Sequence, residues 1–97
     1  MKPVEDLELN QLFSVRGKYV VVTGGGRGIG AMIAEGFARN GAAAVFISSR
    51  SQKQCDEMAA ELTRKTGGRV VALPACDLNK LEDVRALADN VKKALRE

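Results

Sequence analysis

The feature that most constrains the fold is a run of glycines between an apolar segment and a helical one. The run is Thr23-Gly-Gly-Gly-Arg-Gly-Ile-Gly30, and the β-branched segment Tyr19–Thr23 leads directly into it. A short apolar segment ended by glycines is typical of a strand of a parallel sheet that is buried on both faces. From Gly28 to Asn40 apolar residues recur at helical spacing, and Asn40-Gly41 is a stop signal. A strand, a glycine turn and a helix are therefore predicted in this order.

Two further strands and a second helix are predicted beyond this first unit. Ala44–Ser48 is apolar and is expected to form the second strand. Ser51 with Gln54 three residues later fits a capping box, and apolar residues follow at helical spacing until Thr66-Gly67-Gly68. Arg69–Leu73 is expected to form a third short strand, which a proline ends.

A third helix is predicted over the last part of the chain. Asn79 with Glu82 fits another capping box. The order β-α-β-α-β-α with short connections predicts parallel strands joined by right-handed crossovers. We therefore expect an α/β fold over residues 19–97, half of a doubly wound (Rossmann-like) parallel sheet with strand order 3-2-1, preceded by an N-terminal arm at residues 1–18. The apolar stripe of the third helix is Leu81, Val84, Leu87, Ala88, Val91 and Leu95.

The glycine run suits the binding of a pyrophosphate, which the free N–H groups and positive dipole end of a helix attract. Gly24 lies where the strand must turn, Gly28 opens the helix, and Gly30 allows close packing of helix on strand. Gly26 and Ile29 complete the expected binding turn. The spacing G-x-x-x-G-x-G is a variant of G-x-G-x-x-G, and the pattern of a P-loop is absent. We expect nucleotide binding here, with a purely structural tight turn as the alternative.

The end of the second strand indicates which dinucleotide would bind. An acidic residue about 20 positions beyond the turn would accept from a ribose 2′-hydroxyl. The chain has Arg50 there, preceded by Ser48 and Ser49, and a guanidinium fork with hydroxyls suits a 2′-phosphate. Arg27, within the turn, could reach the same phosphate. This pattern favours NADP(H) over NAD(H), although either arginine could instead be a solvated surface residue.

Taken together, these segments resemble the N-terminal part of a short-chain dehydrogenase/reductase. The resemblance rests on a strand, Thr-Gly-x-x-x-Gly-x-Gly, a helix, a strand ending Ser-Ser-Arg and the later Cys76-Asp77-Leu78, and it extends over about residues 12–97. It implies that Asp77 contacts the adenine ring, that Leu78 lines the same pocket, and that both arginines match NADP-dependent members. For Asp77, a local role in a turn or at a helix N-terminus is the alternative.

The catalytic residues of that family are not found in the chain. Members carry, further along, an Asn-Ala-Gly segment, a serine and Tyr-x-x-x-Lys, whereas the one tyrosine here, Tyr19, has Thr23 four positions later. The resemblance implies hydride transfer between NADP(H) and an unidentified carbonyl or alcohol substrate, but we assign no catalytic residue and expect these 97 residues alone to be inactive. A non-catalytic nucleotide-binding or regulatory module that ends at Glu97 is the alternative. A methyltransferase-like nucleoside site is disfavoured by Arg50.

Composition argues against several other functions. The 15 basic and 12 acidic residues are scattered, which does not indicate a nucleic-acid partner. Cys55 and Cys76 form no CxxC pair and the chain has no histidine, so we expect no metal site. No apolar stretch approaches the roughly 20 residues of a membrane span, and the acidic N-terminus does not fit a signal peptide. We expect a cytoplasmic protein, with self-association through the open edge of the first strand at Val20–Val22.

Overall fold

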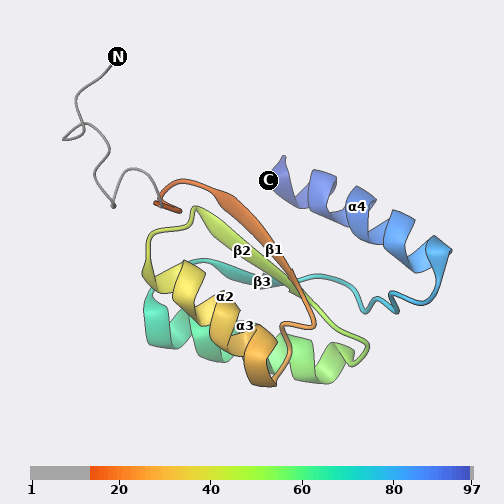
Figure 1. Ribbon diagram of the computed structural model, residues 1–97, viewed down its shortest axis with the longest axis horizontal. Helices are drawn as coiled ribbons and strands as arrows, with labels where there is room; N and C mark the ends of the chain where they lie inside the picture. Colours follow the sequence, from red (N-terminus) through yellow and green to blue (C-terminus); the bar gives the residue numbers. More distant parts are fainter. Residues whose placement is uncertain (1–13, 97) are drawn as a thin grey trace, which may run out of the picture.

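Strands and helices alternate along residues 14–96, the part of the chain that the computed structural model describes (Figure 1). The predicted order β-α-β-α-β-α is confirmed. Of the expected arm, residues 1–13 lie outside the described residues, and residues 14–18 form a turn that the Gly17 N–H ties to the Gly41 carbonyl at 2.9 Å. The elements are β1 (Tyr19–Thr23), α2 (Gly28–Arg39), β2 (Ala44–Ser48), α3 (Gln52–Thr66), β3 (Val70–Ala72) and α4 (Leu81–Leu95).

β2 is the central strand of a parallel three-stranded sheet. It pairs with β1 from Tyr19 opposite Ala44 to Thr23 opposite Ser48, and with β3 from Val45 opposite Val70 onward. The strands lie in the order β1-β2-β3, which is 3-2-1 when it is read from the β3 edge. Parallel pairing brings the carboxyl ends of all three strands to one edge of the sheet.

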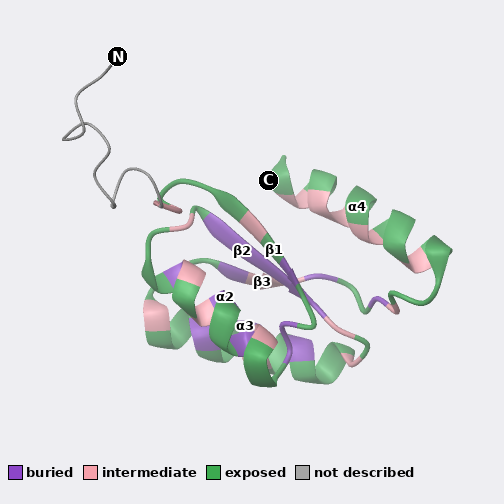
Figure 2. Ribbon diagram, in the orientation of Figure 1, coloured by how far each residue is buried: buried purple, intermediate pink, exposed green. Residues whose placement is uncertain are grey.

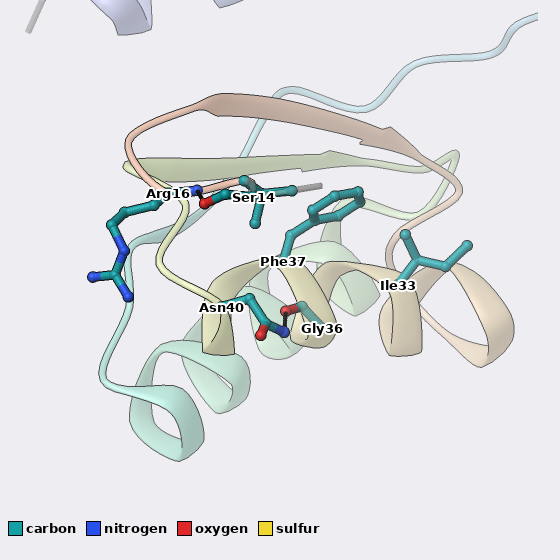
Figure 3. Close-up of a pocket in the computed structure, with 7 residues that line it drawn as sticks. Ser14, Arg16, Ile33, Gly36, Phe37 and Asn40 are labelled. Carbon is teal, nitrogen blue, oxygen red and sulfur yellow. Dashed lines mark hydrogen bonds between the residues drawn. The ribbon is translucent and has the colours of Figure 1, made fainter. Parts of the chain in front are cut away.

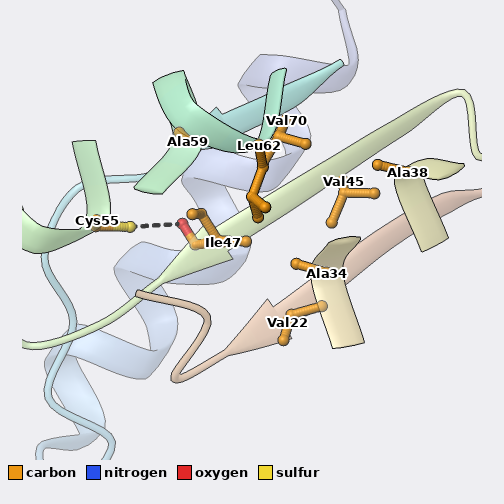
Figure 4. Close-up of a cluster of buried hydrophobic side chains, with 9 residues drawn as sticks. All are labelled: Val22, Ala34, Ala38, Val45, Ile47, Cys55, Ala59, Leu62 and Val70. Carbon is orange, nitrogen blue, oxygen red and sulfur yellow. Dashed lines mark hydrogen bonds between the residues drawn. The ribbon is translucent and has the colours of Figure 1, made fainter. Parts of the chain in front are cut away.

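Helices cover both faces of the sheet. α2 and α3 lie on one face and α4 on the other (Figure 1). The larger core lies between the sheet and the pair α2 and α3, and alanines on α2 let that helix approach the strands closely. Figure 4 shows the members of this core: Val22, Ala34, Ala38, Val45, Ile47, Cys55, Ala59, Leu62 and Val70.

The expectation that β1 is buried on both faces is wrong. Val22 is 8% exposed, but Tyr19 and Val21, which point to the other face, are 58% and 42% exposed. The reason is the position of α4, which packs against a cluster around Phe46 and Leu73 that includes no residue of β1. The strand buried along its whole length is β2, as Figure 2 shows.

The predicted start and end of α3 are confirmed. The Ser51 hydroxyl accepts a hydrogen bond from the Gln54 N–H at 3.3 Å, as a helix cap does. Gly67 ends the helix in the left-handed conformation, with φ 71°, and its N–H donates to the Thr63 carbonyl.

The capping box expected from Asn79 and Glu82 is wrong. α4 begins at Leu81 with no side-chain cap. The Asn79 N–H donates instead to the Asp77 carboxylate at 2.9 Å, so Asn79 belongs to the turn before the helix. The Asp77 N–H in turn donates to the Asp83 carboxylate at 2.9 Å.

The apolar stripe predicted for α4 is only partly covered. Leu87 and Val91 pack on the cluster around Phe46, whereas Leu81 and Leu95 are 64% and 45% exposed. Ala94, in the last turn, also packs on this cluster, so α4 meets the sheet from its middle to its C-terminal turn and its first turn does not. None of the described helices is long and apolar enough to cross a membrane.

The turn between β1 and α2 packs backbone on backbone. A Cβ atom added at Gly30 would collide with the Gly24 carbonyl. Gly24 itself has φ 73°, in the left-handed region that favours glycine. The first turn of α2 is therefore seated directly on the end of β1.

This contact makes Gly30→Ala strongly destabilising. We expect it to lower the free energy of unfolding in urea by about 1–3 kcal/mol, the usual cost of overpacking. The matched control is Gly36→Ala in the same helix, where an added Cβ meets nothing within 4 Å. That variant should gain roughly 0.5–1 kcal/mol, because alanine restricts the unfolded chain. Equal effects of the two substitutions would contradict the close approach.

Candidate functional site

The loops that follow the three strands surround one hollow at the carboxyl edge of the sheet. Its volume is about 560 Å³. Ligands of open α/β sheets bind at this edge, outside the carboxyl ends of the strands. The lining residues are Thr23, Gly24, Gly26, Arg27, Ser48, Ser49, Arg50, Ser51, Gln54, Cys76, Asp77, Leu78 and Asn79.

Most of the residues expected to bind a cofactor line this hollow, and three do not. Gly28 is exposed at the start of α2 with φ 60°, and Gly30 packs against Gly24. Ile29 is 76% exposed. The spacing of the glycines identified the turn, but it could not separate the residues that face a ligand from those that shape the backbone.

Two backbone hydrogen bonds fix the glycine turn against β2. The N–H groups of Gly24 and Gly25 donate to the Ser48 carbonyl at 2.7 and 3.1 Å. A Cβ atom at Gly25 would overlap the side chain of Ile47. The turn is therefore held on the central strand, and the start of α2 is held with it.

The N-terminus of α2 lacks any negative group of its own. Its N-cap residue, Arg27, makes no side-chain cap, and its first turn holds no acidic residue. The other two helices of residues 14–96 differ: Ser51 caps α3, and Glu82 and Asp83 lie in the first turn of α4. The N–H groups and positive dipole end of α2 thus remain available to an anion.

Two arginines add positive charge to the same hollow. Arg27 comes from the turn after β1 and Arg50 from the loop after β2, and both are exposed. The described part of the chain has two ion pairs, in which Glu35 binds Arg39 and Lys65. None of these three residues lines the hollow. The hollow therefore presents two guanidinium groups, neither of which forms an ion pair with a carboxylate of the described residues.

The hydroxyl of Ser49 is engaged within its own loop. Its Oγ donates to the Ser51 carbonyl at 2.9 Å. Ser48 is 2% exposed, so its hydroxyl is also withdrawn from solvent. Among the groups expected at the end of β2, Arg50 is the one most open to a ligand.

The loop after β3 forms the other wall. Asp77 is half-buried and Leu78 is 56% exposed at the rim. The Asp77 carboxylate accepts from the Asn79 N–H, so the local turn role considered for Asp77 is present. That bond uses one oxygen, Oδ1, and leaves the second free of hydrogen bonds from the described residues.

Sequence reasoning missed part of this lining. The following residues border the hollow, although their motifs were not expected to contribute them to a binding site: Thr23, Ser51, Gln54, Cys76 and Asn79. Their common signal is position, because each stands within a few residues of the carboxyl end of a strand.

The two cysteines are free thiols in the interior. Burial raises the pKa of the Cys55 thiol, and burial followed by the nearby Asp83 raises the pKa of the Cys76 thiol. Both thiols are therefore protonated near neutral pH and are poor nucleophiles. The described residues contain no group of three acidic, cysteine or histidine side chains that could hold a metal ion.

A second hollow of similar volume lies beside the C-terminal half of α2 (Figure 3). Its lining includes the apolar side chains of Ile33 and Phe37, and two hydrogen bonds join polar groups of the lining. Asn40 Nδ2 donates to the Gly36 carbonyl, and another bond joins the Arg16 N–H to the Ser14 hydroxyl. It shares no lining residue with the hollow at the strand ends, and it gathers no set of reactive groups.

Comparison with known proteins agrees with this geometry. A model of the short chain dehydrogenase family matches residues 18–97. The probable galactose dehydrogenase GalD of Rhizobium meliloti is 37% identical over 86 residues, which are 86% of this chain and 32% of that protein. D-xylose 1-dehydrogenase of Caulobacter vibrioides is 40% identical over 76 residues, 76% of this chain and 29% of that protein. The chain thus spans about a third or less of the length of these relatives.

Solved structures extend the likeness to three dimensions. The Pseudomonas aeruginosa RhlG/NADP active-site complex has a TM-score of 0.76 and 38% identity over 84% of this chain and 32% of that one. L-sorbose reductase from Gluconobacter frateurii, complexed with NADPH and L-sorbose, has the same score and identity over 82% of this chain and 30% of that one. The chain belongs to the short-chain dehydrogenase/reductase family.

Proposed function

We propose that the hollow at the carboxyl edge of the sheet binds NADP(H), and that residues 19–97 are the cofactor-binding part of an NADP-dependent oxidoreductase. The observation that carries the proposal is the meeting of the uncapped start of α2 with Arg27 and Arg50 in one hollow. A dinucleotide with an extra phosphate brings negative charge to both places.

The adenine half of the cofactor, with its pyrophosphate and 2′-phosphate, has matching groups in the hollow or next to it. The glycine turn and the start of α2 would receive the pyrophosphate, with Gly24 and Gly26 giving backbone access and Gly28, Ile29 and Gly30 shaping the turn. Arg27 and Arg50 would hold the 2′-phosphate, with Ser49 beside them. Asp77 and Leu78 would form the adenine side. The NADP and NADPH complexes among the similar structures support this arrangement.

When bound, NADPH would donate a hydride to a carbonyl substrate, and NADP⁺ would accept a hydride from an alcohol substrate. The chain's own residues would bind and orient the adenine half of the cofactor. We assign no catalytic residue, since Tyr19, the one tyrosine, lies on β1. The dehydrogenase and reductase names of the relatives support the oxidoreductase reading over a non-catalytic module.

Arg50→Ala tests the assignment of the 2′-phosphate. Because hydrogen bonds to a charged group contribute about 1.5–3 kcal/mol, NADPH should bind roughly 10- to 100-fold more weakly. NADH lacks that phosphate, so its affinity should stay within about twofold, on the scale of ordinary surface substitutions. Calorimetric titration of both coenzymes measures the preference. Arg64→Ala, at an exposed arginine of α3 outside the hollow, is the control and should change neither affinity. An unchanged preference in Arg50→Ala would show that the assignment is wrong.

We also propose that the chain associates with itself through β1. On its outer side β1 has no strand partner among residues 14–96, and Tyr19 and Val21 are largely exposed. Such an edge is a template for pairing with another chain. A concentration-dependent rise in the weight-average mass is expected in sedimentation equilibrium.

Val21→Lys should shift this association towards the monomer, because a lysine on an edge strand opposes pairing. Val84→Lys makes the same change at a similarly exposed valine on α4 and should leave the association as it is in the unchanged chain. The role of β1 would be refuted if the unchanged chain stayed monomeric over the whole concentration range. Equal effects of the two lysine substitutions on the association would refute it as well.

A further inference from the structure

The loop after β3 departs from regular strand pairing at Pro74. The Leu73 N–H still donates to the Ile47 carbonyl at 2.9 Å. In an uninterrupted parallel ladder the Ala75 N–H would then donate to the Ser49 carbonyl, two residues further along each strand. The donor at 2.9 Å is instead the N–H of Cys76. The loop has therefore slipped by one residue, and the Ala75 N–H has lost its partner on the second strand.

The side chain of Gln52 takes up this slip. Its Oε1 accepts from the Ala75 N–H at 2.7 Å, and its Nε2 donates to the Leu73 carbonyl at 3.3 Å. One amide group thus satisfies a backbone donor and a backbone acceptor on either side of Pro74. No other partner for these two backbone groups occurs among the hydrogen bonds of residues 14–96 that lie outside regular elements.

Asp56, one turn further along α3, fixes which way the Gln52 amide points. Its Oδ1 accepts from Gln52 Nε2 at 3.0 Å. An ionised carboxylate only accepts hydrogen bonds, so the NH₂ group must face Asp56 and the Leu73 carbonyl. The amide oxygen is left facing the Ala75 N–H, and the flipped arrangement is excluded.

Gln52 therefore joins the two walls of the hollow. It is the first residue of α3, two positions after Arg50. The loop residues that it holds, Leu73 and Ala75, precede Asp77 by four and two positions. It does not itself line the hollow. From this placement we infer that Gln52 is a positioning residue for the cofactor: it acts through the loop backbone to set where Asp77 and Leu78 stand relative to Arg50. The inference rests on the proposed NADP(H) site.

Loss of the Gln52 hydrogen bonds should affect the binding of the adenine ring. A carboxylate accepts hydrogen bonds, and the exocyclic amino group of adenine donates them, so Asp77 can distinguish adenine from hypoxanthine only while it is held in place. Gln52→Leu removes both clamp bonds and leaves a side chain of similar size. NADPH should bind about tenfold more weakly to this variant. The preference for NADPH over its hypoxanthine analogue should fall to near unity.

The test is calorimetric titration of the 97-residue chain with NADPH and with its hypoxanthine analogue. Gln52→Glu keeps an acceptor for the Ala75 N–H but cannot donate to the Leu73 carbonyl, so its loss should be intermediate. Lys53→Leu is the control, because it alters the neighbouring exposed residue of α3 outside the hollow and should bind both ligands like the unchanged chain. Amide hydrogen exchange followed by NMR should show faster exchange at Ala75 in Gln52→Leu.

The outcomes separate the two proposals. If the unchanged chain binds neither ligand, the proposed NADP(H) site is wrong and the role of Gln52 falls with it. If the unchanged chain binds NADPH and Gln52→Leu keeps both the affinity and the preference, the positioning role alone is overturned. An equal loss for the two ligands would mean that Gln52 only stabilises the fold, which also overturns it. Should Gln52→Leu fail to fold by circular dichroism, Gln52→Glu decides between the same outcomes.

Discussion

The rest of the structure depends on the parallel pairing of β2 with both of its neighbours. This strand is buried along its whole length, and its backbone continues to organise the chain beyond the ladder: the Ser48 carbonyl holds the glycine turn, and the Ser49 carbonyl holds the loop after β3. Two consecutive carbonyl groups therefore anchor the two loops that face each other across the hollow. A buried strand that is paired on both sides is a suitable base for a site whose groups come from three separate loops.

The three helices differ in the groups that stabilise their N-termini. α3 satisfies its own N-terminus with Ser51, and α4 has Glu82 and Asp83 in its first turn. α2 has neither, and its N-terminus opens onto the two exposed arginines. A helix start that is left without a cap costs stability, and a bound anion would recover it. Ligand binding and folding stability are therefore expected to be linked at this one terminus.

The local sequence pattern predicted most of the helices and strands and about half of the residues that line the site. The hydrophobic period and the stop signals at Asn40 and Gly67 were sufficient to locate the helices and strands, because these signals depend on residues that are close together in the sequence. The burial of β1 was predicted wrongly, since it depends on where α4 packs. The clamp made by Gln52 joins residues more than twenty positions apart and belongs to no motif. Contacts of that kind follow from tertiary geometry, which spacing along the chain does not report.

The position of α4 has a consequence for how the sheet can grow. The connections from β1 to β2 and from β2 to β3 place their helices on one face, whereas α4 lies on the opposite face (Figure 1). A right-handed crossover over that opposite face must run in the reverse direction. A parallel strand that followed α4 would therefore lie beside β1 and not beyond β3. The direction of winding would then reverse next to the glycine turn, and such a topological switch point is where open α/β sheets form their ligand crevice.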